Sequence, residues 1–263
     1  MLERIARRRG LELVPADGRP APRGRAAAAL ARSGWHLRPV PPPDFDAALV
    51  DTIERVAPYT ATSPERIAAL VRAVEHVVAA GLPGALVECG VWRGGSAMAM
   101  ALTLRRLGVE DRDLVLFDTF SGMTTPTDAD VETDGVVRAG RRRRPTHDEI
   151  QAWSSVGIDE VRANLHSTGY PPERVRLMAG PVEETLPAAA PEELALLRLD
   201  TDWYASTAHE LRHLYPRLRR GGILIVDDYG HWDGARRAVD EFFADAPPFL
   251  HRVDYTARLV VKP

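Results

Sequence analysis

From residue 85 onward, short apolar runs alternate with stretches of helical periodicity, and this alternation limits the folds that the chain can adopt. The runs are as short as buried strands, and the stretches between them are long enough for helices. Strands are therefore predicted at residues 85–89, 114–118, 175–179, 194–200 and 222–228, and helices at 96–107, 149–165, 206–218 and 234–246. This order predicts an α/β fold with a doubly wound, mostly parallel sheet. Residues 250–254 and 258–262 predict two more strands joined by a short turn, and hence an antiparallel C-terminal edge.

Two segments lie outside this pattern. Residues 1–45 are rich in Arg, Ala and Pro, and we interpret them as a partly ordered N-terminal arm with a short helix near 26–31, ahead of a main domain at 46–263. A long polar loop at 119–149 is typical of a lid or of a disordered segment. Its arginine run, Arg141–Arg144, favours a solvated face, with contact to an anionic ligand as the alternative.

Ahead of the first strand, residues 62–67 (TSPERI) predict a helix start. Pro64 suits the first helical position with Ser63 as the cap; alternatively, Thr62 is the cap and Glu65 closes a capping box. The apolar residues that follow recur at helical spacing, so one face of this helix is expected to be buried.

Composition excludes several classes of protein. The 263 residues carry a formal net charge of −3, so no global charge attracts nucleic acid or an acidic membrane surface. The one cysteine, Cys89, excludes an internal disulfide and fits a reducing compartment. No apolar run approaches the roughly 18 residues of a membrane span, and the Arg-rich N-terminus lacks the apolar stretch of a secretory signal. We therefore expect a cytoplasmic enzyme without nucleic-acid or membrane partners.

A glycine-rich segment follows the first predicted strand of the sheet and opens a helix. Residues 87–96 read VECGVWRGGS, and Gly90, Gly95 and Ser96 would let the backbone approach a ligand at the helix start. The spacing G-x-x-x-G-G differs from the G-x-G-x-x-G of dinucleotide-binding proteins, which disfavours NAD. A tight turn without a ligand is the alternative interpretation. Glu88, at the strand end, is unusual for a purely structural turn.

The second predicted strand ends in an acidic residue, Asp118. An ionised carboxylate at this place can accept hydrogen bonds from both ribose hydroxyls of an adenosine-bearing cofactor. The alternative, a helix cap, is weakened because a loop follows rather than a helix. Together with the glycine-rich segment, Asp118 indicates a cofactor site.

Four aspartates follow two later strands, and they are the strongest functional signal. Asp200 and Asp202 end one strand, and Asp227 and Asp228 end the next. Because the carboxyl ends of parallel strands share one edge, these carboxylates should converge there and repel one another unless a cation joins them. Oxygen ligands with open positions suit Mg²⁺. The alternative is that one of the four caps the helix predicted at 206–218. Two nearby histidines form no clear metal pair and are expected at the surface, namely His209 and His231.

At these motifs the sequence resembles the macrocin O-methyltransferase family of sugar O-methyltransferases from antibiotic pathways. The matching segments are TSPERI, VECGVWRGGS, FDTFSGM at 117–123, LRLDTDWYAST at 197–207 and LYPRLRRGGILIVDDYG at 214–230. The resemblance implies a class I, Rossmann-like methyltransferase fold and the methyl donor S-adenosylmethionine (SAM). It also implies Mg²⁺ held by Asp200, Asp227 and Asp228, with Asp202 as the general base. Many such proteins are homodimers, so a homodimer is expected.

The resemblance extends to the SAM site. Thr62 and Ser63 fall where related enzymes approach the methionine part of SAM, and Glu88 is expected to face its ammonium group. Ser121 completes the candidate SAM-binding residues with the glycine-rich segment and Asp118. The usual family glycine between the two aspartates is Thr201 here, and the usual methionine or leucine is Trp203. These two changes put the substrate pocket in question and leave the metal carboxylates intact.

The expected chemistry is methyl transfer to a hydroxyl of a small glycoside or sugar-like substrate. A divalent cation would hold two neighbouring hydroxyls and make one more acidic, with Asp200 as a catalytic ligand, and Asp202 would accept the proton. A catechol-type O-methyltransferase is an alternative, although the 6% aromatic content mildly favours a sugar. A non-catalytic SAM-binding protein is another, disfavoured by the four aspartates. An NAD-dependent oxidoreductase is disfavoured by the glycine spacing.

Overall fold

The computed structural model describes residues 11–15, 32–131 and 145–263, and the chain divides into two compact units at Val50 and Asp51. In the N-terminal unit, strand β1 (Leu11–Pro15) pairs with β2 (Trp35–Pro39) in an antiparallel sheet. Helix α3 (Ala47–Val56) begins in this unit and ends in the next, and no helix was predicted at these residues. The helix predicted near 26–31 and the Arg141–Arg144 run lie outside the described residues.

The larger unit is built on a seven-stranded sheet with the strand order β5-β4-β3-β6-β7-β9-β8. The first five strands in this order are parallel, and the last two are antiparallel. The strands are β3 (Ala85–Cys89), β4 (Leu114–Asp118), β5 (Val175–Ala179), β6 (Leu194–Leu199), β7 (Leu218–Val226), β8 (His251–Arg252) and β9 (Arg258–Val261). The prediction of a mostly parallel, doubly wound sheet with an antiparallel C-terminal edge is confirmed.

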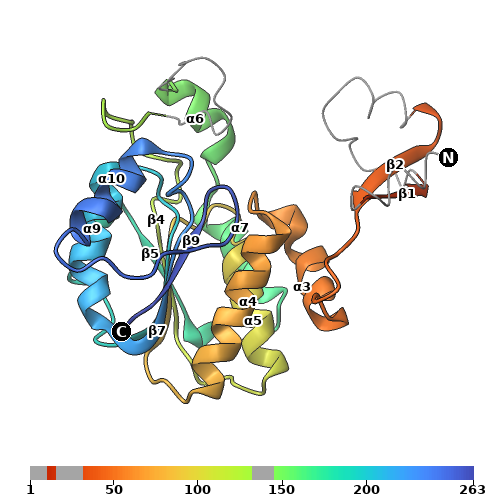
Figure 1. The fold of residues 1–263 in the computed structure, drawn as a ribbon, viewed down its shortest axis with the longest axis horizontal. Helices are drawn as coiled ribbons and strands as arrows, with labels where there is room; N and C mark the ends of the chain where they lie inside the picture. The colour runs from red at the N-terminus through yellow and green to blue at the C-terminus, as the bar shows by residue number, and fades with distance from the viewer. Residues whose placement is uncertain (1–10, 16–31, 132–144) are drawn as a thin grey trace. The chain divides into compact units, whose positions relative to one another are not determined.

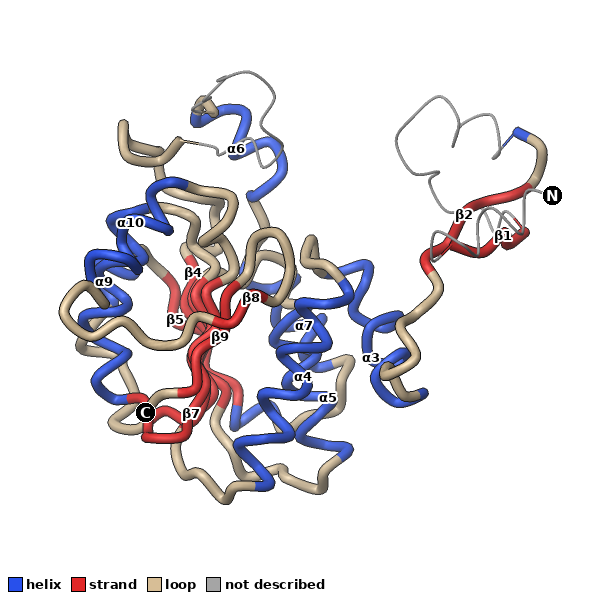
Figure 2. The backbone as a smooth tube through the Cα atoms, viewed as in Figure 1, coloured by secondary structure: helices blue, strands red, loops and turns tan. Residues whose placement is uncertain are grey.

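Helices cover both faces of this sheet, which forms the central layer in Figure 2. Helices α4, α5 and α7 lie on one side, and α9 and α10 lie on the other (Figure 1). The helices of this unit are α4 (Pro64–Ala79), α5 (Gly95–Arg106), α6 (His147–Ser154), α7 (Ile158–His166), α8 (Val182–Thr185), α9 (Tyr204–Leu214) and α10 (Asp233–Phe242). Short 3-10 turns lie at η1 (Ala57–Tyr59), η2 (Pro172–Arg174) and η3 (Tyr215–Arg217). Within the described residues, no helix combines the length and apolar character that a membrane span requires.

Three predicted helices differ from the structure in extent, and the one expected at 234–246 ends at Phe242. The single helix expected at 149–165 is two helices, α6 and α7, separated around Gly157, which adopts an extended conformation and begins α7. Glycine is a poor helix former, which accounts for the break. The helix expected at 206–218 starts earlier and ends at Leu214, because Pro216 lacks the N–H that would continue it and a 3-10 turn follows.

Burial in the core explains why the sequences of the strands are mostly apolar. Every residue of β3 and of β6 is buried, because helices pack on both faces of a parallel sheet. Fully burying one Leu or Val side chain contributes about 1.5–3 kcal/mol. Truncating a fully buried residue such as Leu197 to alanine would therefore cost about 2–5 kcal/mol.

The topology fixes where a ligand can bind. From β3 the chain moves outward through β4 to β5, and then returns to the other side of β3 with β6. In open α/β sheets, ligands bind outside the carboxyl ends of the strands at the point where the strand order reverses. That point is the crevice between the ends of β3 and β6.

Candidate functional site

A cavity of about 460 Å³ lies at this crevice, a volume typical of small-molecule sites. It lies entirely within the larger unit. Most of the predicted site residues line it, namely Thr62, Gly90, Gly95, Ser96, Asp118, Asp200, Asp202, Asp227 and Asp228. Ser63, Glu88 and Ser121 are absent from its wall. The cavity therefore unites the cofactor residues and the aspartates that the sequence predicted separately.

The glycine-rich segment is shaped by neighbouring backbone as well as by space for a ligand. Gly90 has a φ of 83°, and a Cβ there would lie 2.0 Å from the carbonyl oxygen of Asp200. A Cβ on Gly95 would lie 2.6 Å from the carbonyl oxygen of Tyr59. Any side chain at Gly90 would thus push the aspartate-bearing strand end away. The glycine-rich segment and the aspartates are coupled through direct backbone contact.

Asp118 binds the glycine-rich segment with one carboxylate oxygen. Its Oδ2 accepts hydrogen bonds from the backbone N–H of Val91 at 2.6 Å and of Trp92 at 3.1 Å, and its Oδ1 accepts from the N–H of Phe120 at 2.8 Å. The Thr119 hydroxyl also lies 3.4 Å from Oδ1, so of the about four lone-pair sites of a carboxylate at most one remains for a ligand in the cavity. Asp118 is thus positioned for a cofactor by the same bonds that hold the loop.

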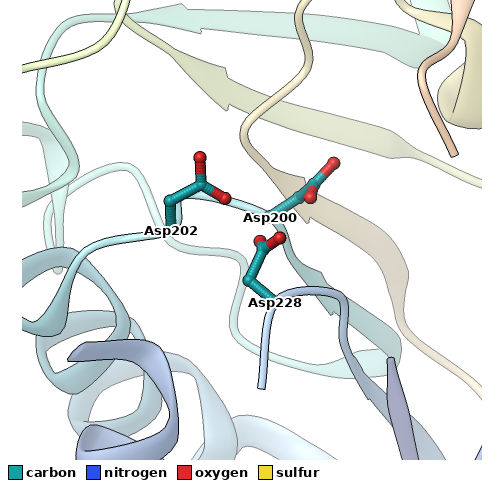
Figure 3. A group of neighbouring side chains, drawn as sticks. All are labelled: Asp200, Asp202 and Asp228. Carbon is teal, nitrogen blue, oxygen red and sulfur yellow. The ribbon is translucent and has the colours of Figure 1, made fainter. Parts of the chain in front are cut away.

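Three of the four aspartates cluster where β6 and β7 end (Figure 3), away from Asp118, which follows β4 on the other side of β3. Asp200, Asp202 and Asp228 each offer a carboxylate oxygen, and these oxygens all lie within 4.8 Å of one another. Burial is the main cause that raises the pKa of Asp200 to about 6 and of Asp202 to about 7, with repulsion from neighbouring carboxylates adding to it. Burial and Asp202 together raise the pKa of Asp228 as well. The buried Oδ2 of Asp228 has no hydrogen-bond partner among the described residues.

The fourth aspartate, Asp227, faces two arginines. Its Oδ1 lies 2.9 Å from Nη2 of the buried Arg198, and its Oδ2 forms a second ion pair with Arg66. Arg198 also contacts Asp200 at 2.8 Å. The two guanidinium groups therefore partly neutralise the acidic end of the cavity. Sequence reasoning missed both arginines, although Arg66 lies in the TSPERI segment and Arg198 lies two residues before Asp200.

Glu88 is placed behind this network rather than at the cavity wall. It stands opposite Arg198 in the parallel register of β3 and β6, and its Oε1 accepts a hydrogen bond from Arg198 at 2.5 Å. Its side chain is 1% exposed, and burial raises its pKa to about 8 despite the arginine. The expected contact between Glu88 and the ammonium group of SAM therefore has no support in this geometry. Glu88 is placed to orient Arg198.

The helix start at 62–67 has the capping arrangement that the sequence predicted, with Ser63 as the cap. The Ser63 hydroxyl accepts a hydrogen bond from the Arg66 N–H at 3.2 Å and donates one to Asp254 at 2.8 Å. Both partners belong to the protein, so the hydroxyl is engaged away from the cavity. Thr62 remains at the wall as the candidate for ligand contact.

Aromatic side chains form much of the remaining wall, and the sequence did not predict this concentration. Four of the five tryptophans line the cavity, namely Trp92, Trp153, Trp203 and Trp232. Trp203 and Trp232 pack edge to face with ring centroids 5.0 Å apart, and the Trp203 indole N–H donates to the Thr124 carbonyl at 3.0 Å. His231, which was expected at the surface, also lines the cavity. A low overall aromatic content thus did not exclude aromatic walls at the site.

The sheet, its switch-point cavity and the carboxylates at three strand ends place the protein in the Rossmann-like class of SAM-dependent O-methyltransferases. More specifically, the chain belongs to the macrocin-O-methyltransferase (TylF) family, whose model matches residues 48–259.

Individual relatives agree with this assignment. The chain is 38% identical over 200 residues to the 8-demethyl-8-(2,3-dimethoxy-alpha-L-rhamnosyl)-tetracenomycin-C 4'-O-methyltransferase of Streptomyces olivaceus. The matched residues make up 76% of this chain and 73% of that enzyme. This chain is 38% identical over 186 residues to the demethyldecarbamoylnovobiocin O-methyltransferase of Streptomyces niveus, covering 71% and 68% of the two chains. The solved structure of the O-methyltransferase NovP matches with a TM-score of 0.69 at 33% identity, over 78% of this chain and 82% of that one.

Proposed function

We propose that this protein transfers the methyl group of SAM to a hydroxyl of a sugar moiety on a glycosylated natural product, with Mg²⁺ as the required cation. The observation that carries the proposal is that the cavity holds the cluster of Asp200, Asp202 and Asp228 at one end and Asp118, which follows β4, at the other, with the glycine-rich segment after β3 between them. A methyl donor and a metal-held acceptor need two such ends within one cavity.

Mg²⁺ fits the acidic end by its donor set. The cluster offers only carboxylate oxygens, which Mg²⁺ prefers, and the buried, unpartnered Oδ2 of Asp228 lacks a counter-charge. We propose Asp200 and Asp228 of this cluster as ligands and, by the family resemblance, Asp227, whose two carboxylate oxygens are paired with Arg66 and Arg198 in the structure. Asp227 lies beside Asp228 on the same wall, and its two arginine contacts hold it in place. When bound, the cation would orient two neighbouring acceptor oxygens and lower the pKa of the one that is methylated.

Asp202 is then left to act as the general base. It lines the cavity beside the proposed ligands, and burial raises its pKa to about 7, which suits a group that exchanges protons near neutral pH. The hydroxyl proton passes to the Asp202 carboxylate while the acceptor oxygen forms its bond to the methyl carbon. The carbon–sulfur bond of the donor would break with its electron pair on sulfur. Because opposite charges disappear in this step, the protein's contribution is mainly positioning.

The positions of the cofactor residues in the cavity suggest which part of SAM each would contact. Asp118 would accept a hydrogen bond from one ribose hydroxyl, and Gly90, Gly95 and Ser96 would lie along the donor at the start of α5. Thr62 would contact its methionine part. The tryptophans around the cavity would exclude water from the transfer step.

The sugar acceptor is supported by the family and by a relative's substrate. The tetracenomycin 4'-O-methyltransferase acts, by its name, on a rhamnosyl group that already carries methoxy groups at positions 2 and 3. The oxygen next to the methylated hydroxyl is then an ether oxygen. For this chain we therefore propose a vicinal diol, or a hydroxyl beside an alkoxy group, as the unit that the cation holds.

The test is a methyl-transfer assay with SAM on a rhamnosyl glycoside and, in parallel, on a catechol. We expect transfer to the glycoside in the presence of Mg²⁺, loss of transfer after chelation with EDTA, and recovery when Mg²⁺ is restored. A strong preference for the catechol would overturn the sugar assignment. Full activity in EDTA would overturn the role of the cation. The homodimer and the cytoplasmic location stay predictions, and sedimentation velocity tests the first.

A further inference from the structure

Glu210 is an acidic side chain in the core that the proposed reaction does not use. It lies on α9 with 0% of its surface exposed, and the residue that follows it, Leu211, belongs to the main apolar core. Its Oε1 accepts a hydrogen bond from the Thr201 hydroxyl at 2.9 Å. Its Oε2 is buried and has no hydrogen-bond partner among the described residues. Burying a carboxyl group in this way is costly, so its retention calls for a reason.

The partner of Glu210 lies in the turn that carries the proposed base. Thr201 stands between Asp200 and Asp202, and its carbonyl accepts a hydrogen bond from the Trp203 N–H at 2.7 Å. This bond spans two residues and closes a γ-turn around Asp202, whose φ is 65°. A positive φ is strained for a residue with a side chain and persists only where the surroundings enforce it.

Contacts on both sides enforce this turn. On one side, the Asp200 N–H donates to the Cys89 carbonyl at 2.8 Å, which ties the turn to β3. On the other side, the Trp203 indole is fixed by the Thr124 carbonyl and by Trp232. The side chain of the first residue of the turn, Thr201, is fixed by Glu210. Glu210 thus supplies a side-chain anchor at the start of the turn.

We propose that Glu210 is a positioning residue that acts through the Thr201 hydroxyl to hold Asp202 in its strained, cavity-facing conformation. The inference rests on the proposed function, in which Asp202 is the base. A glycine adopts varied conformations without a side-chain partner, whereas a threonine offers one hydroxyl by which the turn can be anchored.

The charge state of Glu210 fits this role. Burial raises its pKa to about 8, against the opposing effect of the Thr201 hydrogen bond. A neutral carboxyl group can anchor Thr201 without adding another negative charge near the aspartates. A glutamine would keep the same hydrogen-bond acceptor and the same shape, which provides a matched variant for the test.

The experiment compares two disruptive variants, Thr201→Val and Glu210→Ala, with two conservative ones, Thr201→Ser and Glu210→Gln. We expect kcat to fall about 10- to 100-fold in the disruptive pair, as for a misplacement of about 1 Å, and to stay within about twofold of wild type in the conservative pair. The Kd for SAM, measured by calorimetry, should change less than about twofold in all four. The double variant Thr201→Val/Glu210→Ala should be no worse than either single one, since both remove the same bond.

A second readout needs no activity. Hydrogen exchange at the Trp203 amide, which is bonded to Thr201, should be faster in Thr201→Val than in wild type and unchanged in Thr201→Ser. Unchanged exchange in Thr201→Val would overturn the inference, and so would a kcat loss equal in the conservative and disruptive variants. If wild type transfers no methyl group while Thr201→Val still loosens the turn, the proposed function fails and the anchoring role stands. If Glu210→Ala fails to fold, the test rests on Thr201→Val, because valine keeps the shape of threonine and removes only the hydroxyl.

Discussion

The two ends of the cavity are organised by different forces. At the cofactor end, Asp118 accepts hydrogen bonds from backbone N–H groups, so its charge is compensated by the loop that it orders. At the acceptor end, four aspartates face two arginines, Arg66 and Arg198, and burial raises the pKa of the aspartates. The cofactor end is complete in the protein alone. The acceptor end is left with excess negative charge, which the proposed Mg²⁺ would neutralise.

The largest effect is expected at the acceptor end, from Asp202→Asn. An amide cannot accept the hydroxyl proton, so kcat should fall about 10²- to 10⁴-fold, the usual contribution of a positioned general base. Calorimetric titration should give a Kd for SAM close to that of wild type, because Asp202 lies away from Asp118. The matched control is Asp159→Asn, at a carboxylate that is 91% exposed on α7. Wild-type turnover in Asp202→Asn would remove Asp202 from the mechanism. It would also remove the functional difference proposed between the two ends of the cavity.

A smaller effect of the opposite kind is expected at the cofactor end, from Asp118→Asn. Hydrogen bonds to a charged group contribute about 1.5–3 kcal/mol, so the Kd for SAM should rise about 10- to 100-fold. With saturating SAM, kcat should change little. Asp113→Asn is the control, because Asp113 precedes the same strand at its far end and pairs with Arg174 on the surface. The comparison fails if Asp118→Asn lowers kcat as strongly as Asp202→Asn and leaves the Kd unchanged.

The sequence predicted the sheet and the placement of the aspartates because both depend on local pattern. The runs of β3 and β6 are buried along their whole length and apolar apart from Glu88 and Arg198, and the rule that parallel strands end at one edge then brings Asp200 and Asp228 together. The antiparallel C-terminal edge followed from two short runs with a turn between them. These features need no knowledge of side-chain contacts.

What the sequence could not show depends on pairing between distant segments. Glu88 has the right residue type for a ligand, but its register opposite Arg198 turns it into a buried ion-pair partner. Gly90 was assigned to ligand approach, whereas the nearest constraint on it is the Asp200 carbonyl. The link between Glu210 and Thr201 joins a helix to a turn, and no spacing rule predicts it. Register and contact across strands, rather than local propensity, decided these roles.

The central claim is that the acceptor end needs a cation, and thermal unfolding against pH, with and without Mg²⁺, tests it most directly. In the folded protein the pKa is raised to about 6 for Asp200 and about 7 for Asp202, against about 4 in an unfolded chain. The folded state therefore binds more protons in this window, so the stability contributed by these groups falls as pH rises from about 4 to about 7. Mg²⁺ replaces the protons, and its stabilising effect should grow over the same range.

At pH 7.5, with Mg²⁺ at about 100 times its Kd, the stabilisation should be about 2.7 kcal/mol, which corresponds to a rise in Tm of roughly 5–10 °C. NaCl at equal ionic strength should give no such rise, and Asp228→Asn should lose it. A Tm that is the same with Mg²⁺ and with NaCl at every pH would contradict the account.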